Sequence, residues 1–309
     1  MGKQAAGTLI YWSLIKGPLS LMNACTAFLG YSAGIYLHGG LSLGKDLSRG
    51  IFVFCAVFFL SGGAAILNNW QDRRIDSHMP RTCRRPIPLG LVSAGHVLPL
   101  AFSQIIISIA GLASASASLS ALAVALAALF LYNGLYTPLK KKTLLAFIPG
   151  LIAGSLPPVI GWTASGGPVS LPALSYMGVA LILWQIPHYG LLLLSDTGNP
   201  ADRILPSFYS YFPRQKLVDL TFALIVFYSF IILWIPIGLS ERPDSMVSLA
   251  ALSAIVAMYA VSLIAVSYYF LKRRRIAVLE KSAFLAFNIC SLFFFLSLSI
   301  YFYTDAYLI

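Results

Sequence analysis

A polar stripe near one quarter of the way along the chain holds the residue types best suited to chemistry. Asn68, Asp72 and Asp76 stand four residues apart. On a helix each such step turns the side chain by only about 40°, so the three lie on one face. Amide and carboxylate oxygens suit Mg²⁺, which completes its shell with water and substrate phosphates. The spacing therefore predicts a magnesium site at a helix end.

Arginines follow the polar stripe at Arg81, Arg84 and Arg85. Their planar guanidinium groups match the geometry of phosphate oxygens. Metal-binding acids beside phosphate-binding bases indicate a diphosphate site. The alternative is a solvated loop in which acids and arginines only pair with each other. Acids next to an apolar segment are costly to bury, and that cost favours the functional interpretation.

A second stretch, "LYTPLKKKT" at 135–143, places Tyr136 and Lys140 four residues apart around Pro138. Proline predicts a turn or a kinked helix end at this point. If the segment ends at the same membrane face as the polar stripe, it forms a second wall facing the phosphates. The alternative is that the lysines only orient the chain in the membrane.

A third stretch, "LILWQIPHYG" at 181–190, carries His188 inside an apolar segment. Such a histidine is costly unless it has a partner, and Pro187 interrupts the backbone ladder, which can open room for a ligand or water. The preceding Trp184 and Gln185 have the same two interpretations, as binding residues or as hydrogen-bonded interior side chains.

The composition sets the class of protein that positions these stretches. The 309 residues are 59% hydrophobic and 10% charged, with a mean hydropathy of +0.83. A soluble domain carries about 25% charged residues. Continuous apolar segments predict an all-α, polytopic membrane protein, because the strands of a β-barrel would alternate. Four scattered cysteines give no support for a disulfide framework or a zinc site.

Nine segments are long enough to cross the roughly 30 Å hydrocarbon core, so we expect a nine-helix bundle formed by one domain over residues 1–309. They are Leu19–Leu37, Gly50–Trp70, Ala94–Ala113, Leu119–Leu135, Leu144–Trp162, Leu171–Leu194, Leu217–Ile237, Met246–Leu271 and Ser282–Tyr303.

The distribution of basic residues predicts the orientation. With the N-terminus inside, all of the 21 Lys and Arg except Lys45, Arg49 and Arg242 fall in inside segments. The positive-inside rule then predicts a cytoplasmic N-terminus and an external C-terminus. The net charge of +11 follows from this topology and from contact with lipid headgroups, so nucleic-acid binding is not expected. No removable signal or transit segment is evident, which favours a prokaryotic cytoplasmic (inner) membrane.

The polar stripe and its arginines resemble the first aspartate motif of the UbiA-type intramembrane prenyltransferases. Together with "YTPLKKKT", "GSLPPVIGW" (154–162) and "LWQIPHY", they look most like the heme O synthase (protoheme IX farnesyltransferase) branch. The resemblance covers about residues 60–210. It implies a nine-helix bundle with active-site loops at 68–90, 134–143 and 195–210. It also implies Mg²⁺-dependent transfer of a farnesyl or polyprenyl group from its diphosphate to a vinyl group of heme B.

The resemblance also implies residue roles. The implied metal ligands are Asn68, Asp72 and Asp76, with Asp196 and Asp202 as weaker candidates for a second metal. The implied diphosphate-binding residues are Asn68, Arg81, Arg84, Arg85, Tyr136 and Lys140. The implied acceptor-side residues are Trp184, Gln185 and His188, and the implied catalytic group is Asp72, Asp76, Lys140 and His188. His188 has three open roles, as an iron ligand, an orienting group or a proton acceptor.

The sequence departs from the heme branch at two places. Asn199 and Pro200 stand where that branch typically has an aspartate and a tyrosine, and Ala146 stands near the position of a usual asparagine. Two alternatives therefore accompany heme O synthesis. One is a prenyltransferase acting on an aromatic or quinone precursor. The remote alternative is a transporter, which would place its polar groups near mid-bilayer in broken helices.

Overall fold

The computed structural model describes residues 3–38, 42–79, 82–116, 119–169, 178–195, 206, 212–232, 246–272 and 277–308, and in these ranges all regular structure is helical. The elements in chain order are α1 (Lys3–Leu14), α2 (Gly17–His38), α3 (Leu43–Asp76), α4 (Ala94–Ala115), α5 (Ser120–Leu129), the π-helical η1 (Phe130–Tyr136), α6 (Thr137–Leu139), the 3₁₀-helical η2 (Leu144–Ala146), α7 (Phe147–Ala164), α9 (Ala180–Ser195), α10 (Arg214–Ile232), α12 (Met246–Lys272) and α13 (Ala277–Leu308).

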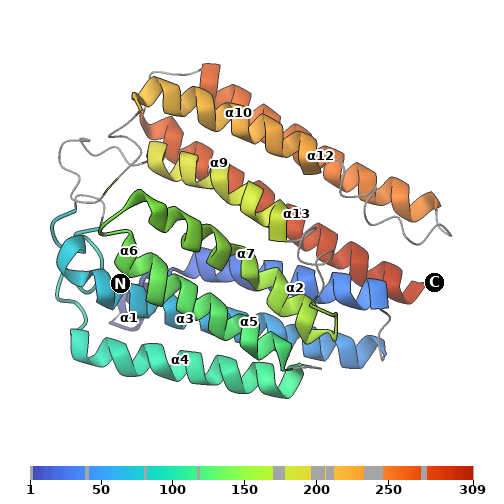
Figure 1. Cartoon of the computed structure of the whole chain (residues 1–309), viewed down its shortest axis with the longest axis horizontal. Coiled ribbons are helices and arrows are strands. Elements are labelled where there is room, and N and C mark those ends of the chain that lie inside the picture. Colours follow the sequence, from blue (N-terminus) through green and yellow to red (C-terminus); the bar gives the residue numbers. More distant parts are fainter. Residues whose placement is uncertain are drawn as a thin grey trace.

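The helices lie side by side along one direction (Figure 1). Helix α2 is central, because it packs against α3, α7 and α13. On one side of it α3 contacts α4, and α7 contacts α5; on the other side α9, α10, α12 and α13 pack together. The two termini lie at opposite ends of the bundle (Figure 1), where an odd number of membrane crossings would place them.

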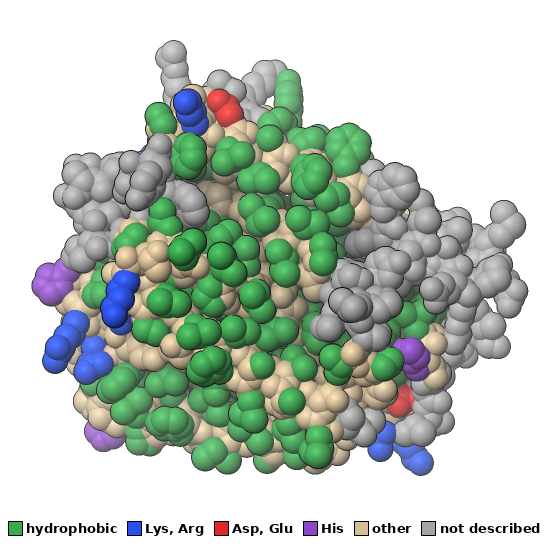
Figure 2. Space-filling view, viewed as in Figure 1, with side chains coloured by type: hydrophobic (Ala, Val, Ile, Leu, Met, Phe, Trp, Pro, Cys, Tyr) green, Lys and Arg blue, Asp and Glu red, His purple; other side chains and the backbone are tan. Residues whose placement is uncertain are grey.

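Six helical stretches within the described residues are long and apolar enough to cross a membrane. They are Leu43–Asp76, Ala94–Ala115, Ser120–Leu139, Leu144–Ala164, Arg214–Ile232 and Ser282–Phe302. The all-α, multi-pass prediction therefore holds, whereas the count of nine is not established. Apolar side chains cover most of the face seen in Figure 2, with Lys and Arg toward its edges.

The other three predicted spans also fall on helices. The first coincides with α2, and two more overlap the shorter apolar helical stretches Ala180–Leu194 and Ser253–Ala265. Helix α2 is rich in small and polar residues because most of its side chains are buried against neighbouring helices. A helix enclosed by protein does not need the apolar surface that lipid demands.

Glycines set the distance between α2 and α7. A Cβ atom at Gly161 would lie 1.8 Å from the backbone oxygen of Ala27, and one at Gly30 would lie 1.9 Å from that of Pro158. The backbones of the two helices therefore touch directly. Small residues permit this close approach. Because lipid tails are as apolar as the helix surfaces, van der Waals packing must replace the hydrophobic effect in holding the two helices together.

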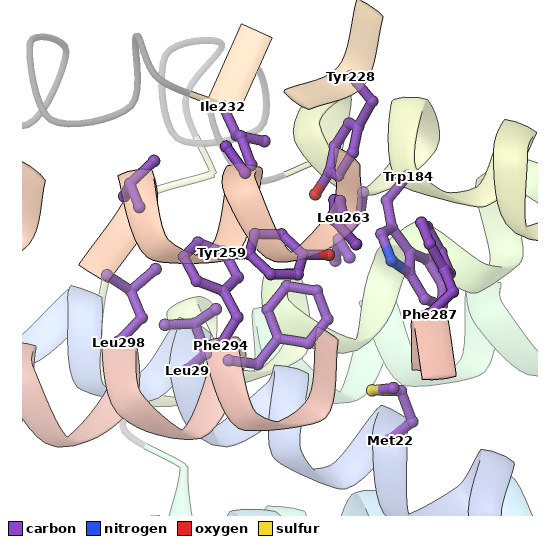
Figure 3. Close-up of a cluster of buried hydrophobic side chains, with 14 of the residues drawn as sticks. Met22, Leu29, Trp184, Tyr228, Ile232, Tyr259, Leu263, Phe287, Phe294 and Leu298 are labelled. Carbon is purple, nitrogen blue, oxygen red and sulfur yellow. The ribbon is translucent and has the colours of Figure 1, made fainter. Parts of the chain in front are cut away.

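An aromatic cluster joins the C-terminal helices. It includes Trp184 from α9, Tyr228 from α10, Tyr259 from α12 and Phe294 from α13 (Figure 3). The rings of Tyr259 and Phe294 stack with centroids 4.1 Å apart. The polar end of Tyr259 is satisfied inside the cluster, because its hydroxyl group lies 2.7 Å from Ser291 Oγ. Tyrosine and tryptophan fill such a core only when their polar ends find partners.

The close α2–α7 contact predicts that Gly161→Ala destabilises the protein by about 1–3 kcal/mol, the usual cost of overpacking. The added methyl group would meet a backbone carbonyl, which cannot rotate away. Thermal unfolding in detergent measures the effect as a lower midpoint. Gly95→Ala is the matched control, because nothing lies within 4 Å of a Cβ there. Equal midpoints for the two variants would contradict the packing argument.

Candidate functional site

The polar stripe lies at the C-terminal end of α3 and is buried. The helix continues beyond the predicted span end at Trp70 to Asp76, so the three residues share one helical face. Asn68, Asp72 and Asp76 are 1%, 4% and 5% exposed. Carboxylates this deeply buried require partners, because an unpaired buried charge is strongly unfavourable. The partners of Asn68, Asp72 and Asp76 come from three other parts of the chain, around Lys16, Arg85 and Lys140.

Asp72 is the centre of the site. Its Oδ2 accepts hydrogen bonds from Lys140 Nζ at 2.5 Å and from Asn68 Nδ2 at 2.9 Å. Its Oδ1 lies 3.2 Å from Lys141 Nζ, but the geometry is not that of a hydrogen bond, and this buried oxygen has no hydrogen-bond partner among the described residues. Asp72 thus carries one hydrogen-bonded oxygen and one oxygen whose neighbour is an ammonium group without a hydrogen bond to it.

Asp76 pairs with the loop that follows the stripe. Arg85 Nη1 donates to Asp76 Oδ2 at 2.6 Å, and the Thr82 hydroxyl donates to the Asp76 backbone oxygen at 3.2 Å. These contacts hold the segment 82–85, which we call the arginine loop, against the end of α3. Arg84 is exposed and takes part in none of the ion pairs of the described residues, and Arg81 lies outside those residues.

Lys16, between α1 and α2, completes the cluster. Its Nζ donates to Asn68 Oδ1 at 2.6 Å and to the Tyr132 hydroxyl at 3.2 Å. Burial lowers the pKa of Lys16 well below its ordinary value, and the nearby positive charges of Arg85 and Lys140 lower it further. From the sequence, this lysine is expected only to orient the chain in the membrane. The sequence signal for its role in the cluster is the position of Lys16 just before the first predicted span, Leu19–Leu37.

The segment around Pro138 brings Lys140 to the stripe. Residues Phe130–Tyr136 form a π-helix, whose wider turn precedes a proline that cannot continue a regular helical hydrogen-bond ladder. Asn133 Nδ2 donates to the Ala64 backbone oxygen at 3.0 Å, which ties this segment to α3. The ring of Tyr136 lies under Lys140, with Nζ 5.1 Å from its centroid. The kinked end predicted from the sequence is therefore a π-helical turn.

Thr137 is a second residue that the sequence analysis missed. It is fully buried, accepts from Asn68 Nδ2 at 3.1 Å and donates to the Tyr132 backbone oxygen at 2.8 Å. Asn68 is therefore held at both ends of its amide, by Lys16 on the oxygen and by Asp72 and Thr137 on the nitrogen. Such a network holds one rotamer and leaves little freedom for the stripe.

Trp184 and Gln185 take part in helix packing. Trp184 Nε1 donates to Ser291 Oγ at 2.8 Å inside the aromatic cluster (Figure 3). Gln185 Nε2 donates to the Leu151 backbone oxygen of α7 at 2.9 Å. The two side chains hold α9 against α13 and α7 respectively. None of their hydrogen bonds within the described part of the chain reaches the polar stripe.

His188 lies one turn further along α9. Its ring stacks on Trp184 with centroids 4.7 Å apart and lies 5.1 Å from the ring of Phe284. Its Nδ1 is buried and has no hydrogen-bond partner among the described residues. An imidazole nitrogen without a partner in an apolar setting is unfavourable, so this atom is suited to a ligand.

The donors of the polar stripe fit a hard divalent cation. Asp72 and Asp76 would supply carboxylate oxygens and Asn68 an amide oxygen, and Asp72 Oδ1 is buried without a hydrogen-bond partner among the described residues. The described residues contain no cluster of three or more His, Cys, Asp or Glu, so these two carboxylates are its acidic component. Mg²⁺ commonly takes one or two carboxylates and obtains its other ligands from water and phosphate. Asp196, Asp202, Asn199 and Pro200 lie outside the described residues.

Comparisons with known proteins identify similar sequences and folds. The model of the UbiA prenyltransferase family matches residues 23–298. The chain is 31% identical over 224 residues to a protoheme IX farnesyltransferase of Nitratidesulfovibrio vulgaris, covering 72% of this chain and 75% of that protein. It is 35% identical over 179 residues to a protoheme IX farnesyltransferase of Opitutus terrae, covering 58% of each.

Two solved structures have similar folds. One is a UbiA homolog from Archaeoglobus fulgidus bound to GPP and Mg²⁺, with a TM-score of 0.67 and 14% identity over 96% of this chain and 99% of that one. The other is the apo structure of a UbiA homolog from Aeropyrum pernix K1, with a TM-score of 0.71 and 19% identity over 91% of this chain and 96% of that one. At these identities the likeness concerns the fold.

The Asp76–Arg85 pair predicts that Asp76→Ala releases the arginine loop from α3. Limited digestion with trypsin then cleaves after Arg84 at least about threefold faster, because a locally opened backbone is the substrate of proteolysis. Asp46→Ala is the control, since Asp46 contacts the Ser42 backbone nitrogen at the opposite end of the same helix. Equal cleavage rates in both variants would show that the ion pair does not hold the loop.

Proposed function

The chain belongs to the UbiA prenyltransferase family and is a prenyltransferase, and we propose that it moves a farnesyl or other polyprenyl group from its diphosphate to a vinyl group of heme B. The observation that carries the diphosphate half is the buried polar stripe, whose two aspartates face a convergent set of lysines and an arginine. The relatives named protoheme IX farnesyltransferase support heme as the acceptor.

We infer that Asp72 and Asp76, with Asn68, hold Mg²⁺ on the diphosphate. Asp72 Oδ1, which is buried and accepts no hydrogen bond from the described residues, supports this role, as does the Mg²⁺ bound with GPP in the Archaeoglobus fulgidus homolog. Asp196 and Asp202 are the weaker candidates for a second metal. When bound, the ion supplies Lewis-acid stabilisation of the diphosphate as the prenyl C–O bond breaks.

The cations around the stripe stabilise the leaving group. Negative charge grows on the diphosphate as its bond to the prenyl carbon breaks. Lys140, Lys141 and Arg85 already lie beside the aspartates, so positive charge is present at the site before that negative charge appears. Preorganised positive groups of this kind can lower a barrier by several kcal/mol. Arg81, Arg84 and Tyr136 complete the proposed diphosphate-binding set.

The acceptor side is assigned to α9. His188 faces the acceptor in this proposal, because its Nδ1 is buried and has no hydrogen-bond partner among the described residues. Trp184 stacks on the imidazole and fixes its orientation, and Gln185 holds α9 against α7. The apolar interior of the bundle excludes water, which would otherwise capture an allylic cation before the acceptor does.

The proposed location is the cytoplasmic (inner) membrane of a prokaryote, with the N-terminus in the cytoplasm and the C-terminus outside. The asymmetry of Lys and Arg along the chain supports this orientation. The opposite positions of the two termini are consistent with it (Figure 1). Bulk lipid then contacts the apolar exterior, and prenyl diphosphate enters with its charged group toward the cytoplasmic end.

A prenyltransferase acting on an aromatic or quinone precursor is the second candidate. It shares the diphosphate half, so the polar stripe does not distinguish the two acceptors. Membership of the prenyltransferase family removes the transporter alternative.

Asp72→Asn is expected to lower kcat/KM for prenyl transfer at least about a hundredfold, because the central carboxylate is lost from both the metal site and the lysine pair. Release of pyrophosphate from farnesyl diphosphate with Mg²⁺ measures the loss. Asp219→Asn is the matched control, since it makes the same change in α10, a different helix from the one that carries the polar stripe. Near-normal transfer by Asp72→Asn would reject the metal assignment.

The acceptor is tested by incubating purified protein with Mg²⁺, farnesyl diphosphate and heme B, and analysing the extracted porphyrins by mass spectrometry. If heme B is the acceptor, we expect a farnesylated heme. Its formation should fall at least about tenfold in His188→Phe, which keeps an aromatic ring but loses both ring nitrogens. If heme stays unmodified while 4-hydroxybenzoate or another phenolic acceptor becomes prenylated, the aromatic alternative replaces heme.

A further inference from the structure

The aspartates of the polar stripe are each occupied by a cation of the chain itself. Asp76 pairs with Arg85, and Asp72 pairs with both Lys140 and Lys141. Three cationic side chains therefore face two carboxylates. The cluster is net positive even without counting Lys16, which donates to Asn68. A bare divalent cation entering such a cluster meets repulsion as well as its ligands.

The geometry adds a second obstacle to a free metal ion. Asp72 Oδ2 already accepts hydrogen bonds from Lys140 and Asn68, and Asn68 Oδ1 already accepts one from Lys16. Asp72 Oδ1 has no hydrogen-bond partner among the described residues, but Lys141 Nζ lies 3.2 Å from it. Mg²⁺ demands close, near-octahedral coordination, so Lys140 at Asp72 Oδ2 and Lys141 beside Asp72 Oδ1 compete with the ion for this carboxylate. At least one lysine must leave before the ion can use the site fully.

A lysine that leaves a buried carboxylate needs another anion. Lys140 and Lys141 have only 20% and 27% of their side-chain surface exposed, so they cannot transfer their charge fully to water. Removing one partner of such a pair leaves an uncompensated charge, which is strongly unfavourable. A diphosphate bound at the same place provides several negatively charged oxygens. The ammonium groups of the lysines that a metal displaces can therefore form ion pairs with these oxygens.

We propose that Lys140 and Lys141 occupy Asp72 until a prenyl diphosphate arrives, so that the metal and the diphosphate bind together and the metal alone binds poorly. This inference rests on the proposed function and specifies the binding order at its site. The two ligands each raise the affinity of the protein for the other, as linkage requires. The physical consequence is that the site does not hold a bare divalent cation in the absence of substrate.

Titration of the purified full-length protein with Mn²⁺, read by the electron paramagnetic resonance of free Mn²⁺, tests the proposal. The diphosphate probe is farnesyl thiodiphosphate, which reacts slowly. We expect Mn²⁺ to bind wild-type protein at least about tenfold more tightly when the probe is present. We expect Lys140→Met to bind Mn²⁺ alone at least about tenfold more tightly than wild type, a change of about 1.4 kcal/mol, and to show a smaller effect of the probe.

Lys142→Met is the matched control. It removes the same charge two residues away, and Lys142 takes part in none of the ion pairs of the described residues. Its Mn²⁺ affinity should equal that of the wild type. Lys141→Met is the second variant, for use if Lys140→Met does not fold, and it should shift the affinity in the same direction.

Three results would overturn the inference. The first is equal Mn²⁺ affinity of wild-type protein with and without the probe. The second is an unchanged affinity in both Lys140→Met and Lys141→Met. The third is an equal increase in Lys142→Met, which would indicate a general charge effect. Each leaves the proposed function standing if pyrophosphate release persists. Wild-type protein that binds no Mn²⁺ with the probe and releases no pyrophosphate would instead refute the proposed function.

Discussion

The burial of Asp72 at the end of α3 is the constraint on which the site depends. A carboxylate 4% exposed at the end of a membrane helix is tolerated only when cations and donors surround it. Those groups come from segments far apart in the chain, with Lys16 before α2 and Lys140 after α6. The helix ends that carry them must therefore meet at one end of the bundle. The same convergence that stabilises the acid creates a cluster of positive charge suited to a diphosphate.

Lipid imposes a second constraint on how these ends are brought together. Because lipid tails are as apolar as the helix surfaces, close packing must hold the helices. Gly30 and Gly161 permit direct backbone contact between α2 and α7, and α2 in turn packs against α3. Helix α2, which follows Lys16, and helix α3, which carries the polar stripe, are thus held by a glycine-lined centre. The site is accordingly built on rigid elements, with the exception of the arginine loop, which Asp76 anchors.

The C-terminal helices solve a different problem, which is to enclose polar atoms without water. Trp184 and Tyr259 share Ser291 as a partner, and Gln185 reaches a backbone oxygen of α7. His188 is the exception, since its Nδ1 has no hydrogen-bond partner among the described residues. One stretch of α9 therefore combines side chains that position the helix with one that is open to a ligand. This division is not visible in "WQIPHY", where Trp184, Gln185 and His188 are equally plausible binding groups.

The sequence by itself determined the membrane class, the helical stripe of Asn68, Asp72 and Asp76, and a break near Pro138, because hydropathy and helical periodicity are local properties of a chain. It also placed Lys140 at the same membrane face as the stripe, as a residue facing the phosphates. Only the tertiary structure distinguished Arg85, which pairs with Asp76, from the exposed Arg84. It also revealed Lys16 and Thr137, which lie 52 and 69 residues from Asn68 along the chain. Contacts at such separations depend on which helix ends the packing brings together, and no local pattern encodes that choice.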